Sequence, residues 1–340
     1  MQNVPATPSE QTPRLLFIVG MWRSGTSLVH ALLNRHPQVA LMYETEPVEL
    51  WPQGAGAART KDWTQRLEFY NQTFSRHELQ QEPFASIPPG REGALALYRE
   101  YARKRGAAIM GEKAPSYYKR LPLLARLFPE ARFLIIWRDP LECCRSAARA
   151  ARGNRFFAQR GMIQRMLLGA EIFAEGAECL LREKRTVCEV VYDEVVENPE
   201  RELQRVCEFL GIPFAPSMLD LKSADVSSVP SGAHHEGVRS GVIGRTAQAD
   251  EILPLPFVGK GKRYAKLWRE RFSQLGFARA LVVQADINRP GPVEMVTDRC
   301  VWKCWRGIDA SKQFLFRRMP LSWWSRMRSA TPRGGTKAET

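Results

Sequence analysis

The chain has 340 residues, of which 44% are hydrophobic and 25% charged, proportions typical of a globular protein with a substantial core. Its 50 Lys and Arg outnumber 36 Asp and Glu, and the net charge of +14 suits a polyanionic partner, an anionic membrane surface or a nucleotide with several phosphates. No apolar run approaches the ~18 residues that cross a membrane, and no nucleic-acid-binding motif is present. These features disfavour a membrane-spanning protein and a nucleic-acid-binding protein.

The N-terminus and the cysteines indicate the compartment. Residues 1–13 lack the basic and apolar segments of a secretory signal, so we expect a short disordered leader and a cytoplasmic protein. The 7 cysteines are scattered through apolar patterns, which favours free thiols over a disulfide framework. Cys300 and Cys304 have no second ligand pair at zinc spacing, and we predict no metal site.

The first predicted elements surround a glycine-rich loop. The apolar run Leu15–Val19 predicts a strand, the sequence GMWRSGTS follows it, and apolar residues then recur at helical spacing over 28–33. A turn between a strand and a helix directs backbone N–H groups and the helix dipole at an anion. The spacing resembles a nucleoside-triphosphate P-loop, but Thr26 replaces the lysine that contacts the β- and γ-phosphates. Because the cation here is Arg23, we expect a phosphate-bearing donor other than ATP or GTP.

Strands and helices alternate along the following residues. Strands are predicted at 38–42, 107–111, 132–137 and 186–192, and helices at 63–74, 91–105, up to 127, 140–152, 161–182 and 198–210. This alternation predicts an α/β fold with a parallel sheet of about five strands flanked by helices. Ligands of such sheets bind beyond the carboxyl ends of the strands, where we expect five side chains to gather: Arg23, Glu44, Lys113, Arg138 and Tyr192.

A second anion site is predicted after the strand at 132–137. Arg138 ends this strand, Pro140 begins a helix, and Ser146 follows the arginine by eight positions. A guanidinium and a hydroxyl in this arrangement can hold one phosphate from two directions. In the structural alternative, Arg138 pairs with Asp139 or a neighbouring carboxylate, and Ser146 is an ordinary helix residue.

The chain resembles the sulfotransferases that use 3′-phosphoadenosine 5′-phosphosulfate (PAPS). Their first loop, [KR]-S-G-T-[TS], binds the 5′-phosphosulfate, and it corresponds to Arg23, Ser24, Gly25, Thr26 and Ser27. Their second motif, an arginine before [DN]-P with a serine eight residues later, binds the 3′-phosphate and corresponds to Arg138 and Ser146. A third segment, 191–199 followed by FLG at 209–211, is also similar, so that the resemblance covers about residues 14–215.

Among the branches of this family, tyrosylprotein sulfotransferases and their bacterial relatives are the most similar, through segment 36–45. This resemblance implies that Glu44 is the catalytic base and that Lys113, in a K-x-P turn, is catalytic. Glu46 stands where those enzymes carry an arginine of the acceptor site, which argues against an acidic peptide as acceptor. From the residues alone, Glu46 and Glu49 remain alternatives to Glu44.

The resemblance also implies two further contacts with the donor. It assigns Tyr192 to the adenine site, although a core tyrosine is the structural alternative. It assigns Arg245, within a long loop predicted over 223–262, to the donor phosphate.

We therefore predict a P-loop-like, nucleotide-binding sulfotransferase that moves a sulfuryl group in line from PAPS to a hydroxyl of a glycan, a glycolipid or a small metabolite. Arg23 and Lys113 supply the cations, and no metal is expected. The domain is predicted to span 14–298 with a helical acceptor-binding insert at 50–105, and residues 150–170 are expected to help shape the acceptor pocket. A basic, tryptophan-rich extension at 299–340 suits peripheral contact with an anionic membrane. Alternatives are a P-loop nucleotide or small-molecule kinase and a non-catalytic membrane-surface protein.

Overall fold

The structure is a computed structural model that describes residues 13–47, 91–154, 156–159, 162–222 and 236–244. Several predictions lie outside these residues and stay predictions: the leader, the helix at 63–74, most of the 50–105 insert, most of the 223–262 loop, Arg245, Cys300, Cys304 and the extension at 299–340.

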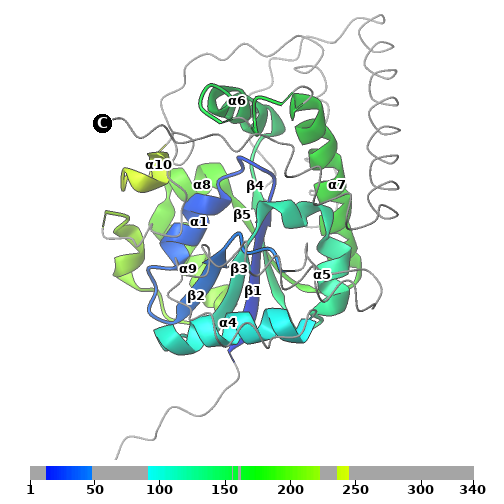
Figure 1. Cartoon of the computed structure of the whole chain (residues 1–340). Coiled ribbons are helices and arrows are strands. Elements are labelled where there is room, and N and C mark those ends of the chain that lie inside the picture. The colour runs from blue at the N-terminus through cyan, green and yellow to red at the C-terminus, as the bar shows by residue number, and fades with distance from the viewer. Residues whose placement is uncertain (1–12, 48–90, 155, 160–161, 223–235, 245–340) are drawn as a thin grey trace, which may run out of the picture. The chain divides into compact units, whose positions relative to one another are not determined.

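A parallel sheet of five strands lies at the centre of the described part (Figure 1). The strands are β1 (Arg14–Gly20), β2 (Val39–Tyr43), β3 (Ile109–Lys113), β4 (Arg132–Trp137) and β5 (Thr186–Val191). Their order is β2-β3-β1-β4-β5, and every neighbouring pair is parallel. The four strands β1 to β4 are buried along nearly their whole length, as expected when helices cover both faces of a sheet. The predicted fold class is confirmed.

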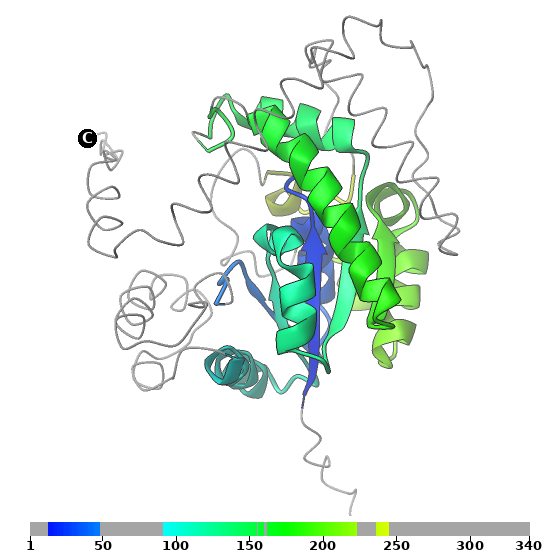
Figure 2. The ribbon, with the colours of Figure 1, turned by 90° about the vertical axis from the view of Figure 1, so that its right-hand side faces the viewer.

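Helices form a layer on each face of this sheet. One layer contains α1 (Thr26–Leu33), α8 (Tyr192–Glu197), α9 (Pro199–Leu210), the 3-10 helix η2 (Pro216–Leu219) and α10 (Glu236–Arg239). The other contains α4 (Arg91–Arg105), the 3-10 helix η1 (Pro115–Lys119), α5 (Leu121–Leu127) and α7 (Met162–Arg182), and Figure 2 shows α5 and α7 in front of the sheet. Helix α6 (Pro140–Ala150) follows β4 and packs on α7 beyond the carboxyl end of the sheet.

The side chains of the central strand β1 alternate between two halves of the core. Leu16 and Ile18 belong to a cluster with residues of α1 and α9. Phe17 lies on the opposite face, where its ring centroid is 5.2–6.0 Å from four other aromatic rings, those of Tyr98, Tyr117, Phe128 and Phe133. Aromatic pairs at such spacings add to the hydrophobic stabilisation of the core. Both layers are thus anchored to the strand that leads into the predicted phosphate loop.

Several predicted boundaries differ from the structure, most of them by one or two residues. Strand β3 continues to Lys113, two residues beyond the predicted end, because Glu112 and Lys113 both find polar partners inside the protein. Strand β5 ends at Val191, and Tyr192 begins the short helix α8, which was not predicted. The helix predicted up to residue 127 is divided at Arg120 into η1 and α5.

Candidate active site

A pocket of about 580 Å³ opens where the five strands end. Residues that follow each strand contribute to its lining, as expected at the carboxyl edge of a parallel sheet. Eight of the predicted site residues line it: Arg23, Gly25, Thr26, Ser27, Glu44, Arg138, Ser146 and Tyr192. Of the others, Ser24 and Lys113 are buried beside it, and Arg245 lies outside the described residues.

The loop from β1 to α1 presents an uncapped helix N-terminus to this pocket. Gly25 precedes α1 in a left-handed conformation with φ 96°, and Arg23 is also left-handed with φ 70°. Within the described part of the chain, no side chain caps α1. The first N–H groups of a helix need partners and carry partial positive charge, so this terminus is suited to an anion.

Two buried polar atoms of the same region have no hydrogen-bond partner among the described residues. They are Oγ of Ser24 and Nε of Arg138. A buried polar atom without a partner costs about 1–3 kcal/mol, so such atoms are suited to a ligand that supplies the missing bonds. Gly25 lets the ring of Tyr192 pack against this loop, because a Cβ at this position would lie 2.1 Å from Cδ2 of Tyr192.

Arg138 is held toward the first loop by its contacts. Its guanidinium lies over the ring of Tyr192, 4.2 Å from the centroid, and its Nη1 donates a hydrogen bond of 3.0 Å to the backbone oxygen of Arg23. Asp139 instead caps α6, where its carboxylate accepts hydrogen bonds from the N–H groups of Leu141 and Glu142. The alternative in which Asp139 pairs with Arg138 is therefore not what the structure shows.

Arg23 connects the two predicted anion sites. Its Nε donates a hydrogen bond of 3.0 Å to Oγ of Ser146, the serine of the second motif. Burial, and then the charge of Arg138, lower the pKa of Arg23 from its ordinary value. An anion in the pocket would offset both effects, so the electrostatics of this side favour a polyanionic ligand.

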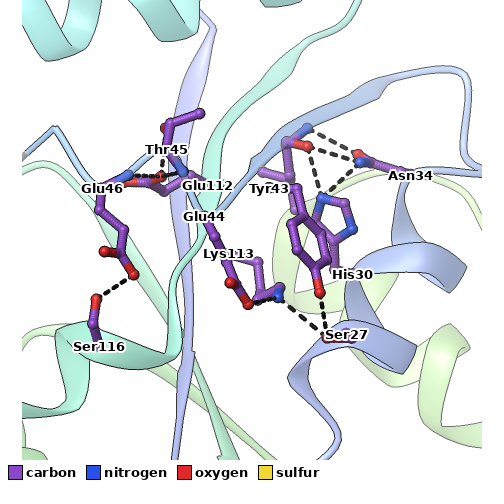
Figure 3. Close-up of polar contacts among 11 residues, drawn as sticks. Ser27, His30, Asn34, Tyr43, Glu44, Thr45, Glu46, Glu112, Lys113 and Ser116 are labelled. Atoms are coloured by element: carbon purple, nitrogen blue, oxygen red, sulfur yellow. Dashed lines mark hydrogen bonds and ion pairs between the residues drawn. The ribbon is translucent and has the colours of Figure 1, made fainter. Parts of the chain in front are cut away.

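Glu44 and Lys113 form an ion pair at the other side of the pocket (Figure 3). Nζ of Lys113 lies 2.5 Å from Oε1 of Glu44 and 3.2 Å from Oγ of Ser27, and it stands over the ring of Tyr43, 3.4 Å from the centroid. Burial by itself would lower the pKa of Lys113, but the charge and hydrogen bond of Glu44 and the nearby Tyr43 outweigh it and raise that pKa. The ion pair with Glu44 therefore favours the charged ammonium form of Lys113.

This ammonium compensates for the altered P-loop. Thr26 occupies the position of the P-loop lysine, yet the neighbouring strand β3 brings Nζ of Lys113 to Ser27, the next residue of the loop. A cation therefore approaches the start of α1 from β3 rather than from the loop itself.

Of the two alternative bases, Glu46 is placed by the structure and Glu49 lies outside the described residues. Oε1 of Glu46 accepts a hydrogen bond of 2.6 Å from Oγ of Ser116, and Glu46 lines the pocket together with Glu44. The side chain of Glu44 is 36% exposed and lies against Lys113 and the phosphate loop. Glu44 is thus the carboxylate that the geometry joins to the predicted donor side.

Sequence reasoning missed Glu112, a fully buried carboxylate in β3. It accepts hydrogen bonds from the backbone and the hydroxyl of Thr45, from the N–H of Glu46, and from the hydroxyls of Tyr98 and Tyr117. Burial raises its pKa, and these hydrogen bonds oppose the shift. The sequence gives no signal for this role, because Glu112 directly follows the predicted strand at 107–111 and precedes another charged residue, Lys113.

Residues 154, 156 and 157 line the pocket, as expected for the segment 150–170, but sequence reasoning did not single out the aromatic side chains there. The pocket is lined by Trp22, Phe156 and Phe157, which we call the aromatic wall. The rings pack edge to face, with centroids 5.1 Å apart for Trp22 and Phe156 and 5.2 Å apart for the two phenylalanines. Among the described residues, the exposed large hydrophobic side chains are Phe156 at 40% and Val242 at 57%, and both line this pocket. Exposed apolar groups gathered at one site indicate a binding surface.

The part of the chain that matches a known family contains most of the residues that build the site. A model of the sulfotransferase family matches residues 13–216, more than half of the chain. The chain belongs to the sulfotransferase family. Its relatives include the nodulation protein NoeE of Sinorhizobium fredii, which is 26% identical over 227 aligned positions; the match covers 58% of this chain and 50% of NoeE. Protein-tyrosine sulfotransferase 2 of Gallus gallus is 25% identical over 217 residues, 62% of this chain and 54% of the relative. This sulfotransferase family member thus spans about half the length of these two relatives.

Solved structures of sulfotransferases share the fold of this family member. The sulfotransferase domain from the Synechococcus PCC 7002 olefin synthase has a TM-score of 0.50 and 19% identity, and the match covers 77% of this chain and 98% of that domain. Within the described ranges, no group of three or more His, Cys, Asp or Glu side chains could hold a metal ion. No helix in those ranges has both the length and the apolar character that crossing a bilayer requires.

Proposed function

We propose that this sulfotransferase uses PAPS as donor and moves its sulfuryl group to a hydroxyl acceptor. The observation that carries the proposal is the division of one pocket into two sides. Arg23, Arg138 and the N-terminus of α1 make one side basic, and the Glu44–Lys113 ion pair lies on the other. A donor with charge at both ends and an acceptor that must lose a proton need these two environments side by side.

The donor side would hold the two charged ends of PAPS. Residues 23–27, with the orphaned Oγ of Ser24, suit the 5′-phosphosulfate. Arg138 and Ser146 suit the 3′-phosphate. The ring of Tyr192, which contacts Arg138 and Gly25, suits the adenosine. A further contact from Arg245 remains part of the proposal.

Glu44 would act as the general base. It takes the proton of the acceptor hydroxyl, whose oxygen forms the new bond to sulfur while the bond between sulfur and the donor phosphate oxygen breaks. The electron pair of the broken bond leaves on that phosphate, and adenosine 3′,5′-bisphosphate is released. A positioned base contributes about 10²–10⁴-fold to such a rate. Lys113 and Arg23 would stabilise the charge that develops on the sulfuryl and phosphate oxygens.

The acceptor side favours a ring or an apolar surface next to the reacting hydroxyl. Trp22 and Phe156 bring aromatic rings to the pocket, and Glu44 and Glu46 bring two carboxylates to it. Because like charges repel, these carboxylates disfavour an acidic peptide. We therefore propose a glycan, a glycolipid or a small metabolite as acceptor. The protein-tyrosine sulfotransferases among the relatives make a tyrosyl hydroxyl in a neutral setting the second candidate.

Transfer of radiolabelled sulfate tests this function. The protein is incubated with PAPS labelled with ³⁵S and an extract of its source cells, and labelled products are identified by mass analysis. We expect a sulfated hydroxyl compound that the Glu44→Gln variant does not produce. If the wild-type protein labels nothing in the extract or in a neutral tyrosyl peptide, the proposal is wrong.

Calorimetry separates this function from that of a P-loop kinase. We expect adenosine 3′,5′-bisphosphate to bind without added metal, and magnesium ATP to bind far more weakly. Tight magnesium-dependent binding of ATP would instead support the kinase.

A further inference from the structure

Glu112 lies where four segments of the chain meet. Its carboxylate accepts five hydrogen bonds, and the donors divide cleanly between its two oxygens. Oε2 accepts from the segment after β2: from the N–H of Thr45 at 3.1 Å, the hydroxyl of Thr45 at 2.6 Å and the N–H of Glu46 at 3.0 Å. Oε1 accepts from the hydroxyl of Tyr98 in α4 at 2.7 Å and from that of Tyr117 in η1. One carboxylate thus joins a pocket segment to the helical layer.

The segment that Oε2 holds has a costly backbone. Glu44 and Glu46 are left-handed, with φ of 50° and 51°, on either side of Thr45. Non-glycine residues adopt this conformation only at a cost in free energy, and they keep it only where surrounding contacts impose it. Oε2 accepts hydrogen bonds from the N–H of Thr45, which lies between the two strained residues, and from the N–H of Glu46, which is one of them. These bonds can therefore hold the segment in its left-handed conformation.

Strand β3 holds the same segment at a second point. The N–H of Glu44 donates a hydrogen bond of 2.8 Å to the backbone oxygen of Lys113, and Nζ of Lys113 contacts the Glu44 carboxylate. Successive residues of a strand point to opposite faces, so Glu112 and Lys113 hold the segment from the two sides of β3. Figure 3 shows Thr45 turned toward Glu112 and Glu44 turned toward Lys113.

We propose that Glu112 is a positioning residue for sulfuryl transfer: it holds residues 44–46 so that the Glu44 carboxylate stays beside Lys113 and the phosphate loop. The proposal rests on the proposed function, because Glu44 is there the base. Glu112 itself does not line the pocket and acts through the segment it binds. Transfer therefore depends on the bonds to Oε2, whereas the bonds to Oε1 serve the stability of the fold.

This division gives a matched pair of variants. Thr45→Val and Tyr98→Phe each remove one hydroxyl donor from the same carboxylate and nearly preserve the shape of the side chain. The first acts on the pocket segment and the second on α4, and Tyr117 still donates to Oε1 in the second variant. If Glu112 served only the stability of the fold, the two variants would have similar effects on transfer and on hydrogen exchange of residues 43–47.

Two measurements on the full-length protein test the proposal. Hydrogen exchange is followed in peptides covering residues 43–47, and transfer is followed as release of adenosine 3′,5′-bisphosphate from PAPS with the cell extract as acceptor pool. In Thr45→Val we expect faster exchange in this segment and transfer lowered about tenfold or more, because small displacements of a catalytic group are costly. Affinity for adenosine 3′,5′-bisphosphate should stay that of the wild type. In Tyr98→Phe we expect a lower melting temperature with wild-type transfer and exchange.

Equal effects of the two variants on transfer, or a loss of nucleotide affinity in Thr45→Val, would overturn the proposal. If the wild-type protein transfers no sulfate, the proposed function has failed, and exchange alone then decides whether Glu112 holds the segment. Equal exchange of residues 43–47 in the two variants would in that case show that it does not.

Discussion

Arg23 and Ser146, 123 residues apart in the sequence, meet through a hydrogen bond of 3.0 Å from Nε to Oγ. Each belongs to one of the two predicted anion motifs, and Arg138 adds a second link through the backbone oxygen of Arg23. The two motifs therefore form one continuous wall of the pocket. A ligand that engages one of them meets the other without a rearrangement of the strands.

Removal of Arg138 should weaken donor binding, whereas removal of the Glu44 charge should not. A hydrogen bond to a charged group contributes about 1.5–3 kcal/mol, so Arg138→Ala should lower affinity for adenosine 3′,5′-bisphosphate by roughly 10- to 100-fold. Glu44→Gln should bind this nucleotide as the wild type does and transfer sulfate far more slowly. Calorimetry and the labelled-PAPS assay measure the two effects. Equal nucleotide affinities in the two variants would show that the assigned roles are wrong.

A methyl group at Gly25 should abolish donor binding. Gly25→Ala would place Cβ 2.1 Å from Cδ2 of Tyr192 and force alanine to a φ of 96°. Gly106→Ala is the matched control, because Gly106 is also left-handed, with φ 62°, but nothing lies within 4 Å of the added Cβ. We expect the control to lose only about 1–2 kcal/mol of stability and to keep its nucleotide affinity. Thermal unfolding and calorimetry compare the two variants, and similar behaviour would contradict this account of the loop.

The fold and the basic side of the pocket were predictable because they depend on local patterns. Continuous apolar runs predicted strands buried on both faces, and the rule for parallel sheets brought Arg23, Glu44, Arg138 and Tyr192 to one edge. The end of β3 was not predictable in this way. A sequence pattern treats charged residues such as Glu112 as a sign of a turn, and only the folded protein shows the partners that let it stay buried.

Loss of an aromatic side chain at the acceptor side should affect the acceptor alone. Phe156→Ala removes a ring that is 40% exposed and contacts Trp22 within the pocket. We expect a higher KM for the acceptor identified in the extract, with unchanged affinity for adenosine 3′,5′-bisphosphate. Steady-state kinetics with varied acceptor provide the measurement. An unchanged KM would place the acceptor elsewhere.

The pH dependence of stability should change in Glu189→Gln. Burial raises the pKa of Glu189 to about 8 from an ordinary value of 4.5, although Trp137 donates a hydrogen bond to its carboxylate. Between these two pKa values the folded protein binds a proton that the unfolded chain has lost, so the free energy of unfolding falls as pH rises. Glutamine can still accept from Trp137 and has no proton to lose. Denaturant titrations from pH 5 to 8 should therefore show a weaker decline in the variant, and identical slopes would contradict this.

The aromatic wall and the Glu112 contacts escaped prediction for a common physical reason. Trp22 and Phe156 are 134 positions apart, and Glu112 collects donors from segments before and after it in the chain. Such contacts arise from tertiary packing, for which spacing in one sequence carries no signal. The left-handed backbone of Glu44 and Glu46 could not be predicted either, because glutamate is not a residue type that favours this conformation.

The left-handed residues around the pocket bring stability and ligand binding into conflict in protein engineering. Arg23, Glu44 and Glu46 line the pocket, and each holds a backbone conformation that glycine adopts without strain. Selection for thermal stability alone would favour variants with glycine at these positions. Such variants would be more stable but would lack the charged side chains that line the pocket. Libraries intended to improve this protein should leave these three codons untouched or screen for ligand retention in every round.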